Sequence, residues 1–271
     1  MMNTATLRRL LLLLPVALAG CGSLEPRDSG PRHPVDTHSV AEPVPRAEPR
    51  SKYGNPASYE VNGREYQILA SSDGYVERGI ASWYGTKFHG RRTSSGEPYD
   101  MYKMSAAHKT LPIPCYARVT NLETGRSVIV RVNDRGPFHD NRIIDLSYAA
   151  ANRIGISGKG TGLVEVRAVS SATDTTPATL ATDDATTPTA SHGAPRLYLQ
   201  VGAFVSRGNA DQLRSRLAGN QIPYTSVQEG SRPEGPVYRV RVGPLSGTDE
   251  ADTLAARITE LGFGPPQVVI D

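Results

Sequence analysis

Residues 128–140 read VIVRVNDRGPFHD, and this stretch places an acidic group at the end of the most strand-like run in the chain. Its first half alternates apolar and polar residues, as a half-buried strand does. The alternation stops at Asn133-Asp134-Arg135, and Gly136-Pro137 then forces a turn. Asp134 is therefore expected at the mouth of a strand, where a carboxyl serves either ordinary turn chemistry or an active site.

The residues around this stretch read as a small barrel of short strands. Glu123-Thr124-Gly125 separates two alternating runs and indicates a hairpin. Ser147 and Gly155 stand where they can begin and end one brief helix. Strands are expected over residues 79–84, 118–121, 127–132 and 163–169, and the helix over 146–154. Short strands with little helix favour a small closed barrel.

The last part of the chain contains an internal repeat. The run RLYLQVGAF at 196–204 is answered by VYRVRVGPL at 237–245. Each run leads into an amphipathic helical pattern, over 209–217 and 250–261, and further strands are expected near 224–228 and over 267–270. This order is β-α-β-β-α-β, an α+β arrangement. Strict alternation puts Gln200 and Gly202 on one face of the first strand.

Two stretches offer too little apolar surface to offset the entropy of ordering. Residues 22–56 are rich in Pro, Glu, Arg and Ser, and residues 171–195 are almost wholly Thr, Ala, Asp, Pro and Ser. Both are expected to be disordered linkers.

The first twenty residues have the parts of a secretory signal: two arginines, an apolar run and then small residues. The apolar run is about half the length that spans a bilayer. Leu18-Ala19-Gly20-Cys21 resembles the bacterial lipobox, which implies cleavage before Cys21 and lipidation of its thiol. Gly22 follows, and by the lipobox rule this favours the periplasmic face of the outer membrane. An ordinary signal peptide with a chance cysteine is the alternative.

The composition excludes several classes of function. Loss of the signal leaves 28 basic against 27 acidic residues, so nucleic-acid binding is not expected. Cys21 and Cys115 are the two cysteines of the sequence. With Cys21 acylated no disulfide framework remains, and Cys115 reads as a buried filler. No spacing of His or Cys suggests a metal, and no cofactor is expected.

Several runs of the central region resemble the rare lipoprotein A family, whose fold is a six-stranded double-psi β-barrel. They are ASWYGTKFHGRRTSSGEPYD, MSAAHKTLPIP, RVTNLETGRSVIVRVNDRGPF and RIIDLSYAAANRIGI. The C-terminal repeat resembles a SPOR domain over its whole length. The expected organisation is a signal peptide (1–20), a lipidated N-terminus with a flexible linker (21–74), the barrel (75–170), a second linker (171–195) and the SPOR domain (196–271).

The resemblance implies an endolytic lytic transglycosylase of the septal cell wall. Such enzymes cleave between N-acetylmuramic acid and N-acetylglucosamine in peptide-free glycan strands and leave 1,6-anhydro ends. Asp134 matches the family's catalytic aspartate, and Glu97 and His108 match its companions. Glu97 could hold a second charge or orient the 6-hydroxyl, and His108 could hydrogen-bond a carboxyl. The alternative function is a non-catalytic, expansin-like peptidoglycan-binding lipoprotein.

The resemblance also implies sites that bind glycan. Trp83 and Tyr84 could stack on sugar rings, although Trp83 fits a core position equally well. Ser95 replaces the family's usual Asn before Gly96-Glu97, which puts a sugar contact from that position in doubt, and Asp145 is read as a helix-capping residue. The expected glycan contacts are Trp83, Tyr84, Asn133 and Arg135 on the barrel and Gln200, Ala203 and Arg239 on the SPOR domain. Expected partners are denuded septal strands, outer-membrane lipid through Cys21, and division or amidase proteins.

Overall fold

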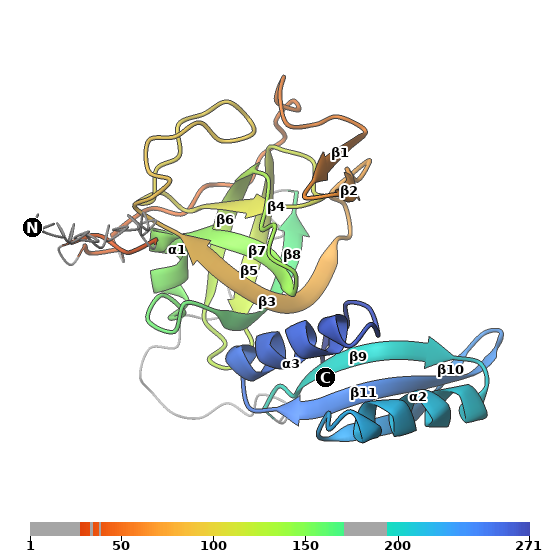
Figure 1. The fold of residues 1–271 in the computed structure, drawn as a ribbon. Coiled ribbons are helices and arrows are strands. Elements are labelled where there is room, and N and C mark those ends of the chain that lie inside the picture. Colours follow the sequence, from red (N-terminus) through yellow and green to blue (C-terminus); the bar gives the residue numbers. More distant parts are fainter. Residues whose placement is uncertain (1–27, 33–34, 38, 171–193) are drawn as a thin grey trace, which may run out of the picture.

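A computed structural model describes residues 28–32, 35–37, 39–170 and 194–271. The expected signal peptide, Cys21 and most of the second linker lie outside these ranges. The described part has a β-barrel followed by a four-stranded sheet with two helices (Figure 1). Within the described part, no helix is both long and apolar enough to cross a membrane.

The central region forms a closed barrel of six strands, in the order β3-β7-β4-β6-β5-β8. Inward-facing valines of β5 and β6 alternate with polar residues, and their side chains meet isoleucines and alanines of the other strands in one buried core. The strands are β3 (Val76–Tyr84), β4 (Ser105–His108), β5 (Cys115–Asn121), β6 (Ser127–Asp134), β7 (Arg142–Ser147) and β8 (Gly162–Val169). The predicted small closed barrel is confirmed.

Two strands and the helix start of the barrel differ from the sequence expectation. Both β4 and β7 are short strands paired in parallel with a neighbour, β4 with β6 and β7 with β3. Neither stands in a long alternating run, so periodicity did not predict them. The helix α1 (Tyr148–Arg153) is shorter than expected because Leu146 and Ser147 belong to β7. Ser147 caps it as predicted, its Oγ accepting a hydrogen bond from the Ala150 N–H.

The N-terminal segment, residues 39–56, differs from the linker expectation because it lies against the barrel. Glu48 forms an ion pair with Arg131 of β6, and Glu42 forms one with Arg153 of α1. A hairpin of β1 (Ser58–Val61) and β2 (Arg64–Gln67) follows. The composition predicted a linker because apolar side chains are few, but polar side chains hold this segment in place.

The C-terminal region folds in the predicted β-α-β-β-α-β order. Its antiparallel sheet has the order β10-β11-β9-β12, and its buried core includes Leu217 of α2 and Ile258 of α3. The elements are β9 (Leu197–Phe204), α2 (Arg207–Gly219), β10 (Thr225–Arg232), β11 (Gly235–Leu245), α3 (Thr248–Glu260) and β12 (Gln267–Ile270).

A bulge in β9 changes which residues share a face of this sheet. The register with β11 shifts between Gln200 and Gly202. A Cβ on Gly202 would lie 3.1 Å from a methyl group of Leu213 in α2, so Gly202 faces the helices. The expectation that Gln200 and Gly202 share a face is therefore wrong, because an extra residue interrupts the alternation.

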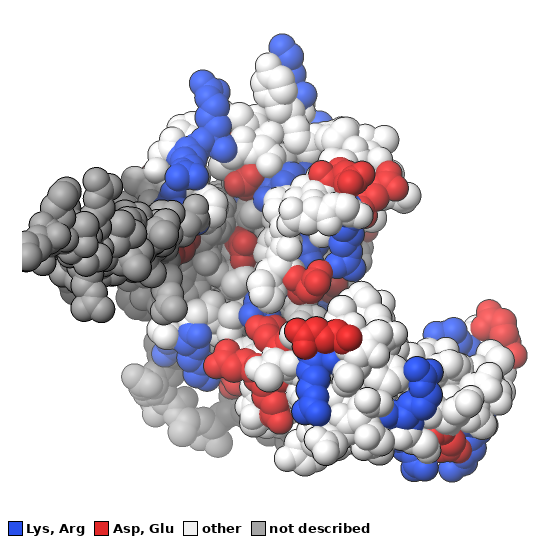
Figure 2. All heavy atoms as spheres, viewed as in Figure 1, with Lys and Arg blue, Asp and Glu red and all other residues white. Residues whose placement is uncertain are grey.

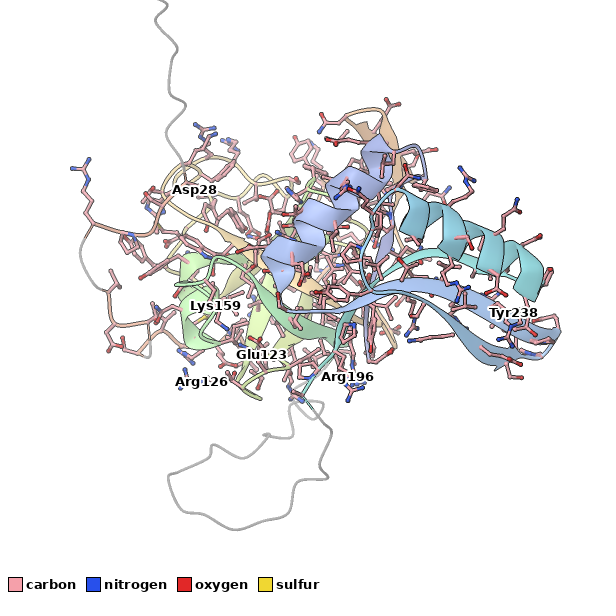
Figure 3. All side chains as sticks on the ribbon, turned by 60° about the horizontal axis from the view of Figure 1, so that its bottom comes forward. Asp28, Glu123, Arg126, Lys159, Arg196 and Tyr238 are labelled. Atoms are coloured by element: carbon pink, nitrogen blue, oxygen red, sulfur yellow. The ribbon has the colours of Figure 1, made fainter. Side chains whose placement is uncertain are left out.

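The two folded regions meet along one side of the barrel. Ile80 of β3 and Leu163 of β8 pack into the same apolar cluster as the core of the C-terminal region. Arg142 of β7 forms an ion pair with Asp252 of α3. Figure 3 shows Glu123 and Lys159 of the barrel near Arg196, where the C-terminal region begins.

Candidate active site

A row of four residues crosses the outer side of the barrel wall, where Ala107 is buried beside Tyr84, Tyr99 and Met101. Ser82 of β3 pairs with Asp145 of β7, Asp145 pairs with Ala107 of β4, and Ala107 pairs with Asp134 of β6. Residues paired in this way point to the same side of a sheet. The preceding residues of β4 and β7, Ala106 and Ile144, belong to the barrel core, so the row faces outward. Two carboxyl groups thus share one outer face.

A bulge brings Asp134 into this row. Strict alternation along β6 would place Asp134 with Val132 in the core. The pairing with β4 slips by one residue between Val132 and Asp134, so that Asn133 is the additional residue. Bulges of this kind re-aim side chains and are common beside active sites.

One oxygen of the Asp134 carboxylate accepts three hydrogen bonds. Ser94 donates two of them to Oδ1, from its backbone N–H and from its hydroxyl, both at 2.7 Å. The Arg135 N–H donates the third at 2.8 Å. Three donors that converge on one oxygen hold the carboxylate in a single orientation. The loop that contains Ser94 therefore fixes the orientation of Asp134.

The same loop carries Glu97, which is held as a carboxylate. Arg131 donates to both of its oxygens at 2.9 and 2.8 Å, and the Asn133 amide donates at 2.8 Å. Burial acts to raise the pKa of Glu97, but the hydrogen bonds from Arg131 and Asn133 outweigh it, and the pKa is lowered. Glu48 contacts the same guanidinium, and hydrogen bonding to Arg131 lowers the pKa of Glu48 to about 2.

A hollow of about 500 Å³ opens beside Glu97. Part of its lining comes from the N-terminal segment, through Val40, Pro43 and Arg46, and part from the barrel, through Glu97 and Arg131. The docked N-terminal segment therefore shapes the surroundings of this carboxylate.

 
His108 is buried, and among the described residues its ring forms no hydrogen bond with Asp134 or Glu97. The His108 Nδ1 accepts hydrogen bonds from the N–H groups of Thr110 and Leu111, and its Nε2 lies 2.9 Å from the hydroxyl of Tyr75. Burial, aided by the nearby charges of Arg135 and Lys109, lowers the pKa of His108 to about 3. The imidazole is therefore neutral, and it organises the turn that follows β4.

Arg135 holds the loops around the site together. Its guanidinium donates to the carbonyl oxygens of Gly54, His108 and Leu111. Burial lowers the pKa of Arg135. The guanidinium carbon of Arg135 lies 6.0 Å from the centroid of the Tyr59 ring. The sequence suggested a glycan contact here, but the structure uses this side chain to bind backbone.

The two aromatic residues proposed to stack on sugars are packed inside the protein. The Tyr84 ring is buried and stacks on Tyr99, with centroids 4.0 Å apart. Trp83 is half-buried and meets Tyr148 edge to face. Tyr84 therefore offers no open ring face to a ligand, and Trp83 occupies the core position that the sequence allowed as its alternative.

Asp145 differs from the other acidic residues of the site in its surroundings. Burial raises the pKa of its carboxyl, while the Ser82 hydroxyl bond and the charges of Arg142, Lys109 and His139 act in the opposite direction. The position of Asp145 before the helix predicted a helix cap, but Ser147 fills that role. The sequence did not predict site roles for Ser94, Arg131 and Asp145. For Arg131 a signal was available, because the alternation of β6 puts Arg131 on the same face as Asn133.

The glycan contacts expected in the SPOR domain lie on the sheet face away from the helices. Arg239 pairs with Ala203, and Arg241 pairs with Gln200, while the neighbouring Val240 belongs to the core. Ala203 is exposed and the other three side chains are partly exposed. The structure thus brings Gln200, Ala203 and Arg239 together on one open surface.

The charges on the surface are mixed. In the view of Figure 2, Lys and Arg side chains alternate with Asp and Glu side chains, and neither sign dominates that face. Among the residues that the structure describes, no group of three or more His, Cys, Asp or Glu side chains could hold a metal ion. Cys115 is buried, and burial raises the pKa of its thiol to about 12.

The barrel with its outward acidic row, followed by a SPOR fold, defines a class of cell-wall-associated proteins. A lytic transglycolase family model matches residues 76–167, and a SPOR domain model matches residues 193–270. The endolytic peptidoglycan transglycosylase RlpA of Vibrio cholerae is 40% identical over 259 residues, which span 94% of this chain and 93% of that protein. The chain belongs to the RlpA family of endolytic peptidoglycan transglycosylases.

A second relative agrees with this family. RlpA of Pseudomonas aeruginosa is 37% identical over 289 residues, covering 90% of this chain and 84% of that protein. The crystal structure of the RlpA SPOR domain from Pseudomonas aeruginosa is 33% identical and covers 27% of this chain and 96% of that chain, with a TM-score of 0.26. The two family models and the two RlpA relatives confirm the family resemblance, and the closed barrel with its following four-stranded domain confirms the expected fold.

Proposed function

We propose that this protein is an endolytic lytic transglycosylase that cleaves the β-1,4 bond between N-acetylmuramic acid and N-acetylglucosamine in peptide-free glycan strands. The product is a strand with a 1,6-anhydro end. The observation that carries the proposal is the pair of preorganised carboxylates, Asp134 and Glu97. Ser94 orients Asp134, and Arg131 and Asn133 of β6 orient Glu97.

The reaction needs few groups from the protein. An acid must protonate the leaving glycosidic oxygen, and a base must take the proton of the muramyl 6-hydroxyl as it attacks its own anomeric carbon. No water molecule has to be activated, unlike in hydrolysis by a glycosidase. Asp134 is the proposed catalytic carboxyl, as the resemblance to the family implies.

Glu97 and His108 have distinct supporting roles in this proposal. Glu97 stays ionised in its contact with Arg131 and Asn133, so its charge can stabilise the positive charge that develops at the anomeric carbon. His108 remains neutral and acts by position, because its backbone carbonyl holds Arg135 next to Asp134.

The second domain supplies the location. We propose that Gln200, Ala203 and Arg239 bind denuded glycan at the division septum and that acylated Cys21 anchors the chain to the outer membrane. Tethering two weak glycan-binding modules raises their effective concentration on the same strand. Division and amidase proteins, which expose denuded strands, are the proposed protein partners.

The test uses the full-length chain in detergent and sacculi whose stem peptides an amidase has removed. We expect 1,6-anhydromuramyl products by mass spectrometry from the wild type and none from Asp134→Asn. Reducing-end products would show a hydrolase. Intact strands that retain the protein in a pull-down would support the expansin-like binding function instead.

A further inference from the structure

The hollow beside Glu97 has walls from two distant parts of the chain. The N-terminal segment contributes Pro43 and Arg46, and the loop before β4 contributes Lys103 and Met104. The lytic transglycolase model matches residues 76–167, so the N-terminal wall lies outside the part of the chain that this model describes. Apolar walls with a few polar groups are typical of sites that bind small ligands or single sugar units.

One buried acceptor in the lining of the hollow lacks a donor. Asn133 is 8% exposed, and its Nδ2 donates to Oε2 of Glu97 at 2.8 Å. This bond fixes the orientation of the amide, because a carboxylate only accepts hydrogen bonds. The Asn133 Oδ1 is buried and has no hydrogen-bond partner among the described residues. A hydroxyl or N–H group of a ligand would satisfy it.

Two cations line the hollow with little or no pairing to acidic residues. Lys103 is exposed, and its ammonium group forms no ion pair or hydrogen bond within the part of the chain that the structure describes. Arg46 lies 3.4 Å from Glu48 through its Nε, and its side chain is 74% exposed. Both positive charges are therefore open to a ligand.

The other charged groups of the lining are engaged with one another. Arg131 is shared between Glu48 and Glu97. Asp100 accepts a hydrogen bond from the backbone N–H of Tyr102, and its Oδ1 lies 3.8 Å from Nδ1 of His89. These contacts tie the carboxylate of Asp100 to its own loop. What the hollow offers to a ligand is thus chiefly positive charge and one amide oxygen.

We propose that the hollow binds the lactyl carboxylate of a peptide-free muramyl residue and that Lys103 and Arg46 select this group. This inference rests on the proposed function. Removal of the stem peptide converts the lactyl amide of a muramyl residue into a carboxylate, on the same ring whose anomeric carbon reacts. Lys103 and Arg46 attract that charge, and Asn133 Oδ1 accepts a hydrogen bond from a hydroxyl or the acetamido N–H of the ring. A strand with its peptides presents a neutral, bulky amide at this position, which the hollow disfavours.

The contacts of Arg131 connect this selection to the reaction. The guanidinium of Arg131 holds Glu97, and it also holds Glu48 of the segment that carries Arg46. One side chain therefore sets the position of Arg46 relative to the carboxylate that is proposed to stabilise the anomeric carbon. Such shared supports keep binding groups and reacting groups in register.

The test compares two denuded substrates that differ in the charge of the lactyl group. One is the strand as an amidase leaves it, and the other is the same strand with its lactyl carboxylates converted to methyl amides. For the full-length wild type in detergent we expect kcat/KM to be about tenfold higher on the charged strand, chiefly through KM, as for two partly exposed ion pairs.

Substitution of the two cations should remove this preference. The double variant Arg46→Gln, Lys103→Gln should cleave both substrates with nearly equal kcat/KM, and Lys103→Arg should keep the preference of the wild type. The control Lys159→Gln, at a lysine that pairs with Glu123 instead, should also keep it. Any effect of the methyl amides on the SPOR domain is common to all variants, so the change in the ratio reports the hollow.

Equal cleavage of both substrates by the wild type, or a preference that persists in the double variant, would overturn the assignment. If the double variant fails to fold, Lys103→Gln decides, and its preference should fall to about threefold. A wild type without anhydro products from the charged strand would instead refute the proposed function. Binding of both substrates to Asp134→Asn, with and without the two substitutions, then measures the preference of the hollow directly, and equal binding would overturn the assignment.

Discussion

The carboxylate of Glu48 holds the N-terminal segment to the barrel through Arg131. Substitution of Glu48 should therefore lower the free energy of unfolding by an amount that depends on pH. The pKa of Glu48 falls from 4.5 to about 2 in the folded protein, mainly through hydrogen bonding to Arg131. A shift of this size corresponds to at most about 3.4 kcal/mol. The pair retains solvent contact, with side-chain exposures of 22% for Arg131 and 16% for Glu48, so we expect about 1–2 kcal/mol for Glu48→Gln at pH 7.

The direction of the pH dependence follows from the lowered pKa. The stabilisation is complete above the unfolded pKa of 4.5 and is lost as the pH falls toward the folded value of about 2. The gap between wild type and Glu48→Gln should therefore close in acid. Urea unfolding followed by tryptophan fluorescence measures this for the barrel alone, because Trp83 is the only tryptophan of the chain.

Glu260→Gln is the control for this measurement, since Glu260 is an exposed acid on α3 in the other domain. It should leave the barrel transition unchanged. An equal destabilisation by Glu48→Gln at pH 7 and at pH 2, or no destabilisation at pH 7, would refute the view that an ionised Glu48 holds the segment in place.

Three other changes test separate parts of the structure. Arg131→Met removes the main donor to Glu97 and should raise the pKa of Glu97, measured by NMR titration of the carboxyl carbon; an unchanged pKa would contradict the role of this contact. Arg239→Ala should weaken glycan binding about tenfold in pull-down titrations, whereas the exposed Arg232→Ala should bind normally; equal binding by both would remove Arg239 from the glycan surface. Ser147→Ala removes the cap of α1 and should cost about 1–3 kcal/mol in urea unfolding of the barrel, and a change below 0.5 kcal/mol would show that the cap is dispensable.

The sequence predicted the elements whose patterns are local. The long alternating strands β5, β6 and β8 and the repeated halves of the SPOR domain follow from periodicity alone. The strand β4 escaped because all four of its residues are buried, which erases alternation. The strand β7 escaped because its two adjacent isoleucines, Ile143 and Ile144, break the polar pattern, although its burial alternates. Residues 39–56 escaped because polar contacts to the barrel, which composition does not count, hold them.

The residues of the candidate site also fall into those that local motifs predict and those that depend on distant contacts. Asp134 and Glu97 could be found from motifs; in the structure Ser94 orients Asp134, and Arg131 of β6 orients Glu97. Ser94 and Arg131 acquire roles only through contacts between distant parts of the chain. Asp145 was misread because its sequence position before a helix suggests a cap, while its place beside Ala107 depends on strand register.

The acidic residues of this site show how one surface can hold acids in different states. Glu97 lies beside a guanidinium and an amide whose hydrogen bonds lower its pKa. Asp134 accepts hydrogen bonds from two N–H groups and a hydroxyl, which fix its orientation. Asp145 has one hydroxyl donor and a desolvated position. Because acid–base chemistry on a glycosidic bond needs a proton donor and an acceptor at the same pH, separation of their environments is the requirement that the fold must meet. The arrangement of neighbours meets it, because the fold places Glu97 beside the guanidinium of Arg131 and leaves Asp145 desolvated, so that the pKa of one carboxyl is lowered and that of the other is raised.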